Sequence, residues 1–183
     1  DGTPPVATGI KTEAFMDAAI IRFSSSNKSY EGEATVSWGR TDKEATITKV
    51  SPYEPGKYSI TLEGLEPGNK TYSVKIWFEN EIAHGETKST SFMTSKAAPV
   101  SWPYIYLGKA AVGNGTFDIG TELPLRVYNA GKAEAIEWSF NGKPIESTGD
   151  GYYEVTQSGT LKAFVYWEDG GVDVLEKHID IAE

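Results

Sequence analysis

The residues best suited to chemistry in this sequence are acidic side chains, because the chain has two histidines and no cysteine. Glu168, Asp169 and Asp173 cluster around a Gly-Gly turn, and Asp150 lies between two glycines. A calcium ion needs about 6–8 oxygen ligands, and these two loops offer several, although their spacing matches no EF-hand. Asp and Gly are also the residues that ordinary turns favour. Asp169 and Asp173 are therefore candidate calcium ligands, with turn formation as the alternative.

The histidines do not indicate a catalytic site. His84 lies in a turn of the first half and His178 in a strand of the second, so we expect both at the surface rather than as a general base or metal ligand. The sequence contains no Gly-x-Ser-x-Gly elbow, phosphate-binding loop or His-Glu-x-x-His motif. A pair of carboxylates for glycoside hydrolysis would need a cleft that these segments do not imply. We predict a protein that is not an enzyme, with no cofactor and no required metal.

The aromatic side chains predict a binding surface instead. Apolar residues alternate through residues 161–167, so that Phe164 and Tyr166 point away from the core. Tyr152 and Tyr153 are adjacent, so one of them faces solvent. Exposed aromatics are a common platform for stacking a sugar or docking a protein. Phe164, Tyr166 and Tyr152 are thus the candidate ligand-binding residues, and packing between domains or across strands is the alternative.

These side chains are expected on β-strands, because apolar positions recur with period two and turn residues separate the segments. The Asn141-Gly142 pair is the strongest hairpin signal in the chain. The predicted strands cover residues 19–23, 34–38, 58–62, 72–78 and 90–92 in the first half, and 104–106, 123–127, 136–140, 153–155, 161–167 and 172–181 in the second. This pattern predicts an all-β fold of two tandem antiparallel β-sandwiches.

Length and composition indicate two domains. A chain of 183 residues exceeds the length of one small sandwich, about 100 residues. Pro99 and Pro103 mark a stiff boundary, so we expect domains at residues 1–97 and 98–183. The first carries 11 basic and 13 acidic residues, a net charge of −2, and the second 6 and 13, a net charge of −7. This acidic balance argues against nucleic acid or anionic lipid as a partner.

No apolar run approaches the roughly 20 residues that a membrane-spanning helix needs. The sequence begins with Asp1 rather than Met, so we expect a processed or trimmed product with any export signal or lipid anchor upstream. The predicted location is extracytoplasmic, at the cell surface or in the periplasm, including a lipid-anchored form on the outer membrane.

The first half resembles a fibronectin type III domain over nearly its whole length. The resemblance rests on Leu65, Pro67-Gly68 and Tyr72, followed by alternating apolar residues. It implies that the Tyr72 hydroxyl bonds back to the chain at a corner and that Leu65 closes the bottom of the sandwich. Phe23 stands where the family usually has Trp, and the Arg-Gly-Asp loop of some members is absent.

The second half resembles an immunoglobulin-like domain without its disulfide. Trp138 and the Asn141-Gly142 turn look like the family's third strand and the turn after it. Leu125 and Ala163 stand where the paired cysteines would be, which implies aliphatic packing around a buried Trp138. The missing cross-link forgoes a stabilisation of typically about 2–4 kcal/mol.

Together the two domains resemble surface lipoproteins of Bacteroides-type gut bacteria, which are often labelled adhesins. The resemblance implies a non-enzymatic adhesion module that displays an aromatic sheet face to a glycan or protein at the cell surface. Two alternatives remain open. In the first, the chain is an accessory or spacer region of a larger secreted peptidase or glycan hydrolase. In the second, it is a purely structural stalk.

Overall fold

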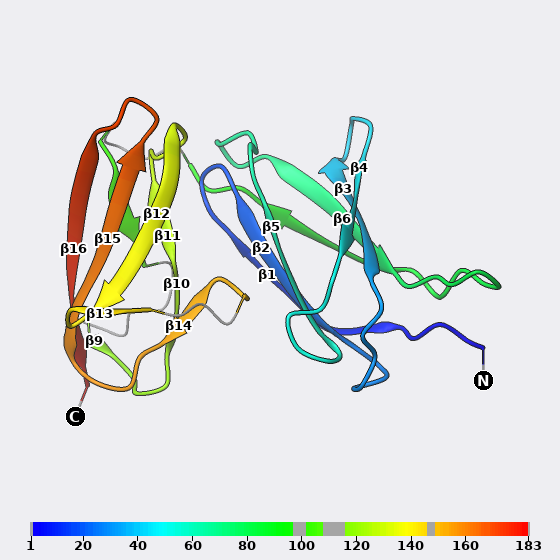
Figure 1. Cartoon of the computed structure of the whole chain (residues 1–183). Helices are drawn as coiled ribbons and strands as arrows, with labels where there is room; N and C mark the ends of the chain where they lie inside the picture. Colours follow the sequence, from blue (N-terminus) through cyan, green and yellow to red (C-terminus); the bar gives the residue numbers. More distant parts are fainter. Residues whose placement is uncertain (1, 97–101, 108–115, 146–148, 183) are drawn as a thin grey trace. The chain divides into compact units, whose positions relative to one another are not determined.

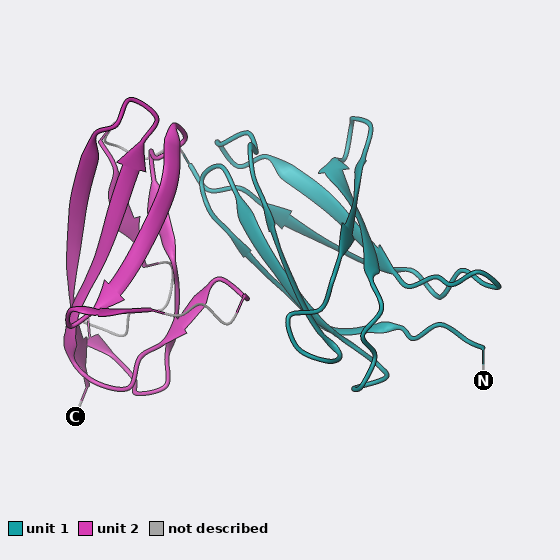
Figure 2. Cartoon of the chain, in the orientation of Figure 1, with its two compact units in different colours: residues 1–97 teal, residues 98–183 magenta. Residues whose placement is uncertain are grey.

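The computed structural model describes residues 2–96, 102–107, 116–145 and 149–182. Every regular element among them is a β-strand, and all strand pairs but one are antiparallel (Figure 1). The chain divides into two compact units, residues 1–97 and 98–183 (Figure 2). Its described residues form no helix that is long and apolar enough to cross a membrane. The all-β class and the paired sandwiches are confirmed.

Unit 1 consists of a three-stranded sheet in the order β1-β2-β5 and a four-stranded sheet in the order β4-β3-β6-β7. Its strands are β1 (Ala7–Ala14), β2 (Ala19–Ser25), β3 (Ala34–Arg40), β4 (Thr46–Val50), β5 (Lys57–Leu62), β6 (Thr71–Trp77) and β7 (Lys88–Met93). Alternate side chains of the two sheets meet in one core. Ile21 and Tyr58 from the first sheet and Val36 and Ile76 from the second are fully buried there.

The corner before β6 has the geometry that the sequence implies. The Tyr72 hydroxyl oxygen accepts a hydrogen bond of 2.9 Å from the backbone N–H of Glu66. Leu65 is buried, and its backbone N–H donates to the carbonyl of Asp17. A buried phenol needs such a partner, because an unpaired hydroxyl would lose its hydration without compensation. Both predictions for this corner are confirmed.

Unit 2 consists of a five-stranded sheet, in the order β13-β12-β15-β16-β9, opposed by the pairs β10-β14 and β11-β8. Its strands are β8 (Tyr104–Tyr106), β9 (Thr116–Phe117), β10 (Glu122–Pro124), β11 (Arg126–Tyr128), β12 (Ala133–Phe140), β13 (Lys143–Pro144), β14 (Tyr152–Glu154), β15 (Gly159–Trp167) and β16 (Val172–Ile181). The core is built from fully buried side chains of both layers, among them Leu123, Val155, Leu161, Val165 and Ile179.

The hairpin between β12 and β13 turns at Asn141 and Gly142, as expected. Both residues have positive φ angles, 50° and 78°, which is the requirement of a type I′ turn. The Asn141 side-chain oxygen also accepts from the backbone N–H of Thr160, so the turn is tied to the start of β15.

The prediction that Trp138 is buried is wrong, because its side chain is only partly buried. The side chain packs against the edge of the core. The reason is its place in the sheet, because β12 pairs with β13 at only Ser139 and Phe140 among the described residues. The centre of the core lies instead under β15, where Leu161, Ala163 and Val165 are completely buried.

Candidate functional site

Phe164 and Tyr166 project from β15 on the side opposite the core. Leu161, Ala163 and Val165 are fully buried, whereas the two aromatic residues between and beyond them are half-buried. Strand geometry sends successive side chains to opposite faces, so the aromatic pair lies on the outer face of the five-stranded sheet. Their outward direction agrees with the alternation in the sequence.

Two valines of β16 extend this apolar surface. Val174 pairs directly with Phe164, and Val172 pairs directly with Tyr166. Directly opposed residues share a face and lie close together. The valines are 52% and 51% exposed, which is unusual for aliphatic side chains of a strand. We call these four residues the aromatic–valine face. Figure 1 shows β12, β15 and β16, which carry and flank it, running side by side.

A carboxylate lies at one border of the aromatic–valine face. The Tyr166 hydroxyl donates a hydrogen bond of 3.1 Å to the Glu137 carboxylate on β12. This bond raises the pKa of Tyr166, because ionising the phenol would remove the proton that it donates to the carboxylate. The bond also fixes the ring in place on the sheet.

Charged pairs occupy the other half of the same outer face. Lys162 and Glu176 approach within 3.3 Å across β15 and β16, and His178 lies 2.9 Å from Asp180. These side chains are largely exposed, so each pair contributes little to stability. The outer face therefore changes from apolar to charged along the length of its strands.

Tyr152 does not belong to this surface. It lies in β14, which pairs with β10 in the opposite layer of the sandwich. Its neighbour Tyr153 packs against the core, with its ring centroid 5.2 Å from that of Phe140. Burial raises the pKa of Tyr153. The expectation that Tyr152 joins Phe164 and Tyr166 in one site is thus wrong, because strand order separates them.

The candidate calcium ligands serve local structure. An Asp169 carboxylate oxygen accepts from the backbone N–H of Gly171 at 2.9 Å, inside the β15–β16 turn. An Asp173 carboxylate oxygen accepts from the indole N–H of Trp167 at 2.9 Å. The described residues hold no group of three or more His, Asp or Glu side chains arranged to bind a metal ion. Turn formation therefore explains Asp169.

The two histidines lie at the surface of different units. His84 is exposed and stacks on Trp77 with ring centroids 5.0 Å apart. His178 is exposed on β16 beside Asp180. The prediction that both histidines lie at the surface is confirmed. His84 belongs to unit 1 and His178 to unit 2.

The sequence interpretation missed Val172 and Val174. Their signal is short, a Val-Asp-Val alternation at the start of the last strand. It does not say which face of the sheet the valines occupy. Only the register between β15 and β16 places them beside the aromatic pair.

Neither a protein-family model nor a curated protein matches the chain. Solved structures with similar folds include a redesigned β-sandwich protein, 24% identical over 49% of this chain and 94% of its own, with a TM-score of 0.43. A myokine structure is 14% identical over 52% of this chain and 100% of its own, with a TM-score of 0.41. The FN1–FN3 domains of chicken CNTN1 are 14% identical over 98% of this chain and 68% of theirs, with a TM-score of 0.41.

Proposed function

We propose that the chain is a non-enzymatic recognition module of the cell surface and that its aromatic–valine face binds a protein partner. The observation that carries this proposal is the contiguous apolar surface on β15 and β16, in which two valines remain about half exposed. Contiguous exposed apolar side chains mark interaction sites, because soluble domains that act alone rarely leave such surface in contact with water.

The chemistry around the aromatic rings favours a protein over a glycan at this face. A sugar needs hydrogen-bonding groups at the edges of the ring on which it stacks. On β16, Val174 lies beside Phe164 and Val172 beside Tyr166. On β12, Glu137 lies opposite Phe164, and its carboxylate already accepts the hydrogen bond of the Tyr166 hydroxyl. Aliphatic neighbours suit the apolar anchor side chains found at the centres of protein interfaces.

The charge of unit 2 indicates the character of that partner. Residues 98–183 carry 6 basic and 13 acidic residues. Glu137 borders the apolar surface on β12, and Glu176 borders it on β16 as the partner of Lys162. Complementary charge raises association rates and excludes partners of like charge. The proposed partner therefore presents an apolar centre with basic side chains around it.

Unit 1 acts in this proposal as the spacer that orients unit 2. The corner bond from Tyr72 supports its assignment as a fibronectin type III-like domain. The β12-β15-β16 arrangement supports an immunoglobulin-like assignment for unit 2. An extracytoplasmic location, with lipid anchoring through an upstream segment in a Bacteroides-type surface protein, belongs to the same proposal.

The proposal is tested by screening the purified full chain on an array of extracellular-matrix proteins and host glycans. The screen is repeated with a variant that combines Phe164→Ala and Tyr166→Ala. Ile119→Ala is the matched control, because Ile119 is 70% exposed in the same unit but lies outside β15 and β16. We expect a protein signal that the double variant loses and the control keeps.

Three outcomes contradict the proposal. A protein signal that survives in the double variant places protein recognition elsewhere on the molecule. No signal from the intact chain favours the alternative, an accessory or spacer region of a secreted peptidase or glycan hydrolase. Retention of glycans through these two aromatic residues would replace the protein partner with a carbohydrate.

A further inference from the structure

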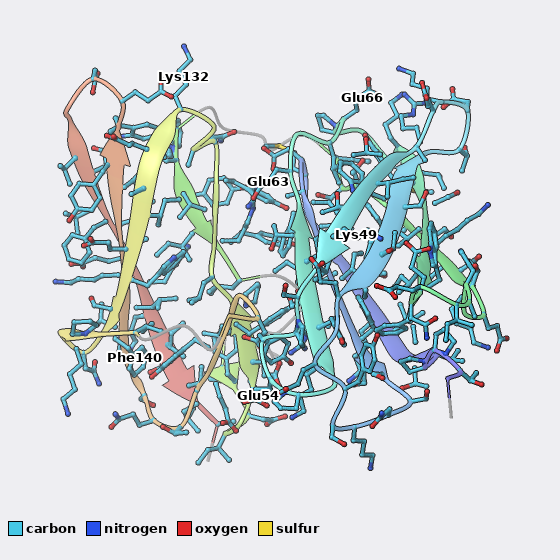
Figure 3. The ribbon with its side chains drawn as sticks, turned by 45° about the vertical axis from the view of Figure 1, so that its right-hand side comes forward. Lys49, Glu54, Glu63, Glu66, Lys132 and Phe140 are labelled. Carbon is cyan, nitrogen blue, oxygen red and sulfur yellow. The ribbon has the colours of Figure 1, made fainter. Side chains whose placement is uncertain are left out.

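A second candidate site lies at one end of unit 2, apart from the aromatic–valine face. A pocket of about 600 Å³ opens where the β11–β12 connection meets the β15–β16 turn. The pocket is lined by Asn129, Gly131, Lys132, Trp167, Glu168 and Asp169. Figure 3 shows Lys132 at this end of β12 and Phe140 at the opposite end. Its volume lies within the range of about 300–1,000 Å³ typical of small-ligand sites.

The walls of this pocket are held by hydrogen bonds. The backbone N–H of Trp167 donates a hydrogen bond of 2.8 Å to the carbonyl of Gly171. The backbone N–H of Gly170 donates a hydrogen bond of 3.0 Å to the carbonyl of Trp167. The N–H of Glu168 donates to the carbonyl of Lys132, which joins the two loops. A preorganised site loses less conformational entropy when a ligand binds.

The Trp167 ring itself is fixed in place. Its indole N–H donates to Asp173, and its side chain packs partly against the core. The two candidate calcium ligands, Asp169 and Asp173, thus help to build the wall of this pocket. Asp173 orients the aromatic wall of the pocket, and Asp169 shapes the turn beside it.

The lining combines an aromatic ring with hydrogen-bonding groups of both kinds. The Lys132 ammonium only donates, while the carboxylates of Glu168 and Asp169 only accept. A hydroxyl group does both, so a ring that carries several hydroxyls satisfies donors and acceptors together. The polarised C–H groups on one face of a sugar are attracted to the negative face of an indole.

Other ligand classes fit these groups less well. Phosphate would face the carboxylates of Glu168 and Asp169, with Lys132 as the one cationic side chain among the described residues of the lining. A wholly apolar ring would strip water from the charged groups without replacing its hydrogen bonds. A neutral sugar avoids both costs.

We infer that this pocket is a saccharide site in which one neutral sugar ring stacks on Trp167 and bonds to Lys132 and Glu168. The site goes beyond the proposed function, because it uses different residues and a different ligand from the aromatic–valine face. It would give the module a carbohydrate contact beside its protein contact.

The test is a nitrogen-15 NMR titration of the full chain with glucose, galactose, mannose and N-acetylglucosamine, each added separately. The readout is the indole N–H signal of Trp167, identified by its loss in Trp167→Phe or by sequential assignment. We expect at least one sugar to shift this signal to saturation. N-acetylneuraminic acid should bind more weakly, because its carboxylate meets Glu168 and Asp169.

Two variants of exposed side chains keep the test independent of folding. Lys132→Ala and Glu168→Gln should each weaken the affinity by about tenfold, the loss of one charge-assisted hydrogen bond. The double variant Phe164→Ala, Tyr166→Ala should bind the sugar as the unaltered chain does, which separates this site from the proposed function. The inference is overturned if none of the four sugars shifts the Trp167 signal to saturation. It is equally overturned if both pocket variants retain full affinity.

Discussion

Side-chain direction along β15 separates core residues from surface residues. Leu161 is completely buried, and Phe164, three positions later, is half-buried on the outer face. Leu161→Ala should lower the free energy of unfolding of unit 2 by about 2–5 kcal/mol, because it leaves a cavity. Phe164→Ala should cost about 1 kcal/mol or less. Urea denaturation of both variants checks this, and losses of equal size would mean that Phe164 belongs to the core.

A buried phenol makes the stability of unit 1 sensitive to high pH. Burial, with a smaller contribution from Tyr30, raises the pKa of Tyr58 to about 12, and the Tyr58 hydroxyl donates to the carbonyl of Gly32 at 2.6 Å. The unfolded phenol has a pKa of about 10. The folded unit therefore binds the proton more tightly, so its stability is complete below pH of about 10 and declines as the pH rises towards about 12.

Urea unfolding of unit 1 across this alkaline range measures the effect of Tyr58. The matched variant Tyr58→Phe cannot ionise, so its unfolding free energy should depend less on pH. The variant also leaves the Gly32 carbonyl without its partner, which costs about 1–3 kcal/mol at neutral pH. An alkaline loss as steep in Tyr58→Phe as in the unaltered chain would assign the effect to other groups.

The residues of the aromatic–valine face differ in how far the sequence predicts their position. Phe164 and Tyr166 follow from their alternation with buried residues of one strand. Tyr152 does not, because the sequence gives no information on which sheet its strand joins. Val172 and Val174 become part of the surface only through their pairing with β15.

Some strands are marked by a local sequence pattern, whereas others depend on pairing with distant parts of the chain. Most segments with apolar alternation between turn residues form strands, and β16 covers the predicted residues 172–181. The single strand predicted at residues 123–127 is wrong, because the chain there forms β10 and β11, which pair with different strands. The sequence did not indicate β1 or β4, whose exposed positions outnumber their buried ones. The two-residue strands β9 and β13 depend on partners elsewhere in the chain, so no local pattern marks them.

One glycine at the entrance to β5 is required by a close backbone approach. Gly56 has a φ of +74°, and a Cβ there would lie 2.5 Å from the carbonyl oxygen of Lys28. Gly64 has a similar φ of +69° but open space around it. Gly64→Ala should cost about 1–2 kcal/mol through backbone strain alone. Gly56→Ala should cost clearly more, because rigid backbone must also move.

Thermal unfolding of the two glycine variants separates strain from steric overlap. The difference between their melting temperatures reports the clash, since the backbone angle is nearly the same. Similar melting temperatures would show that the loop around Lys28 yields at little cost.

The whole chain is built as two sandwiches with separate cores. Domains with their own cores commonly unfold as separate cooperative units. Calorimetry of the full chain should therefore resolve two transitions. Leu161→Ala should lower one of them, and Gly56→Ala should lower the other. A single transition that both variants shift equally would mean that the two units unfold together.

The two units also differ in charge and in the surfaces they expose. Unit 2 has the larger negative charge and carries the aromatic–valine face, while the exposed apolar residues of unit 1, such as Ile47 and Met93, lie on β4 and β7. This asymmetry supports the proposal that unit 2 recognises the partner and unit 1 acts as the spacer.

The most direct measurement is a methyl NMR titration of the full chain with a protein retained in the array screen. We predict that the signals of Val172 and Val174 shift on binding, while those of Ile119 and Ile47 stay in place. The valines report on the surface without any mutation, so a folding defect cannot imitate the result. Shifts confined to Ile47 and Met93, with both valines unchanged, would contradict recognition through unit 2.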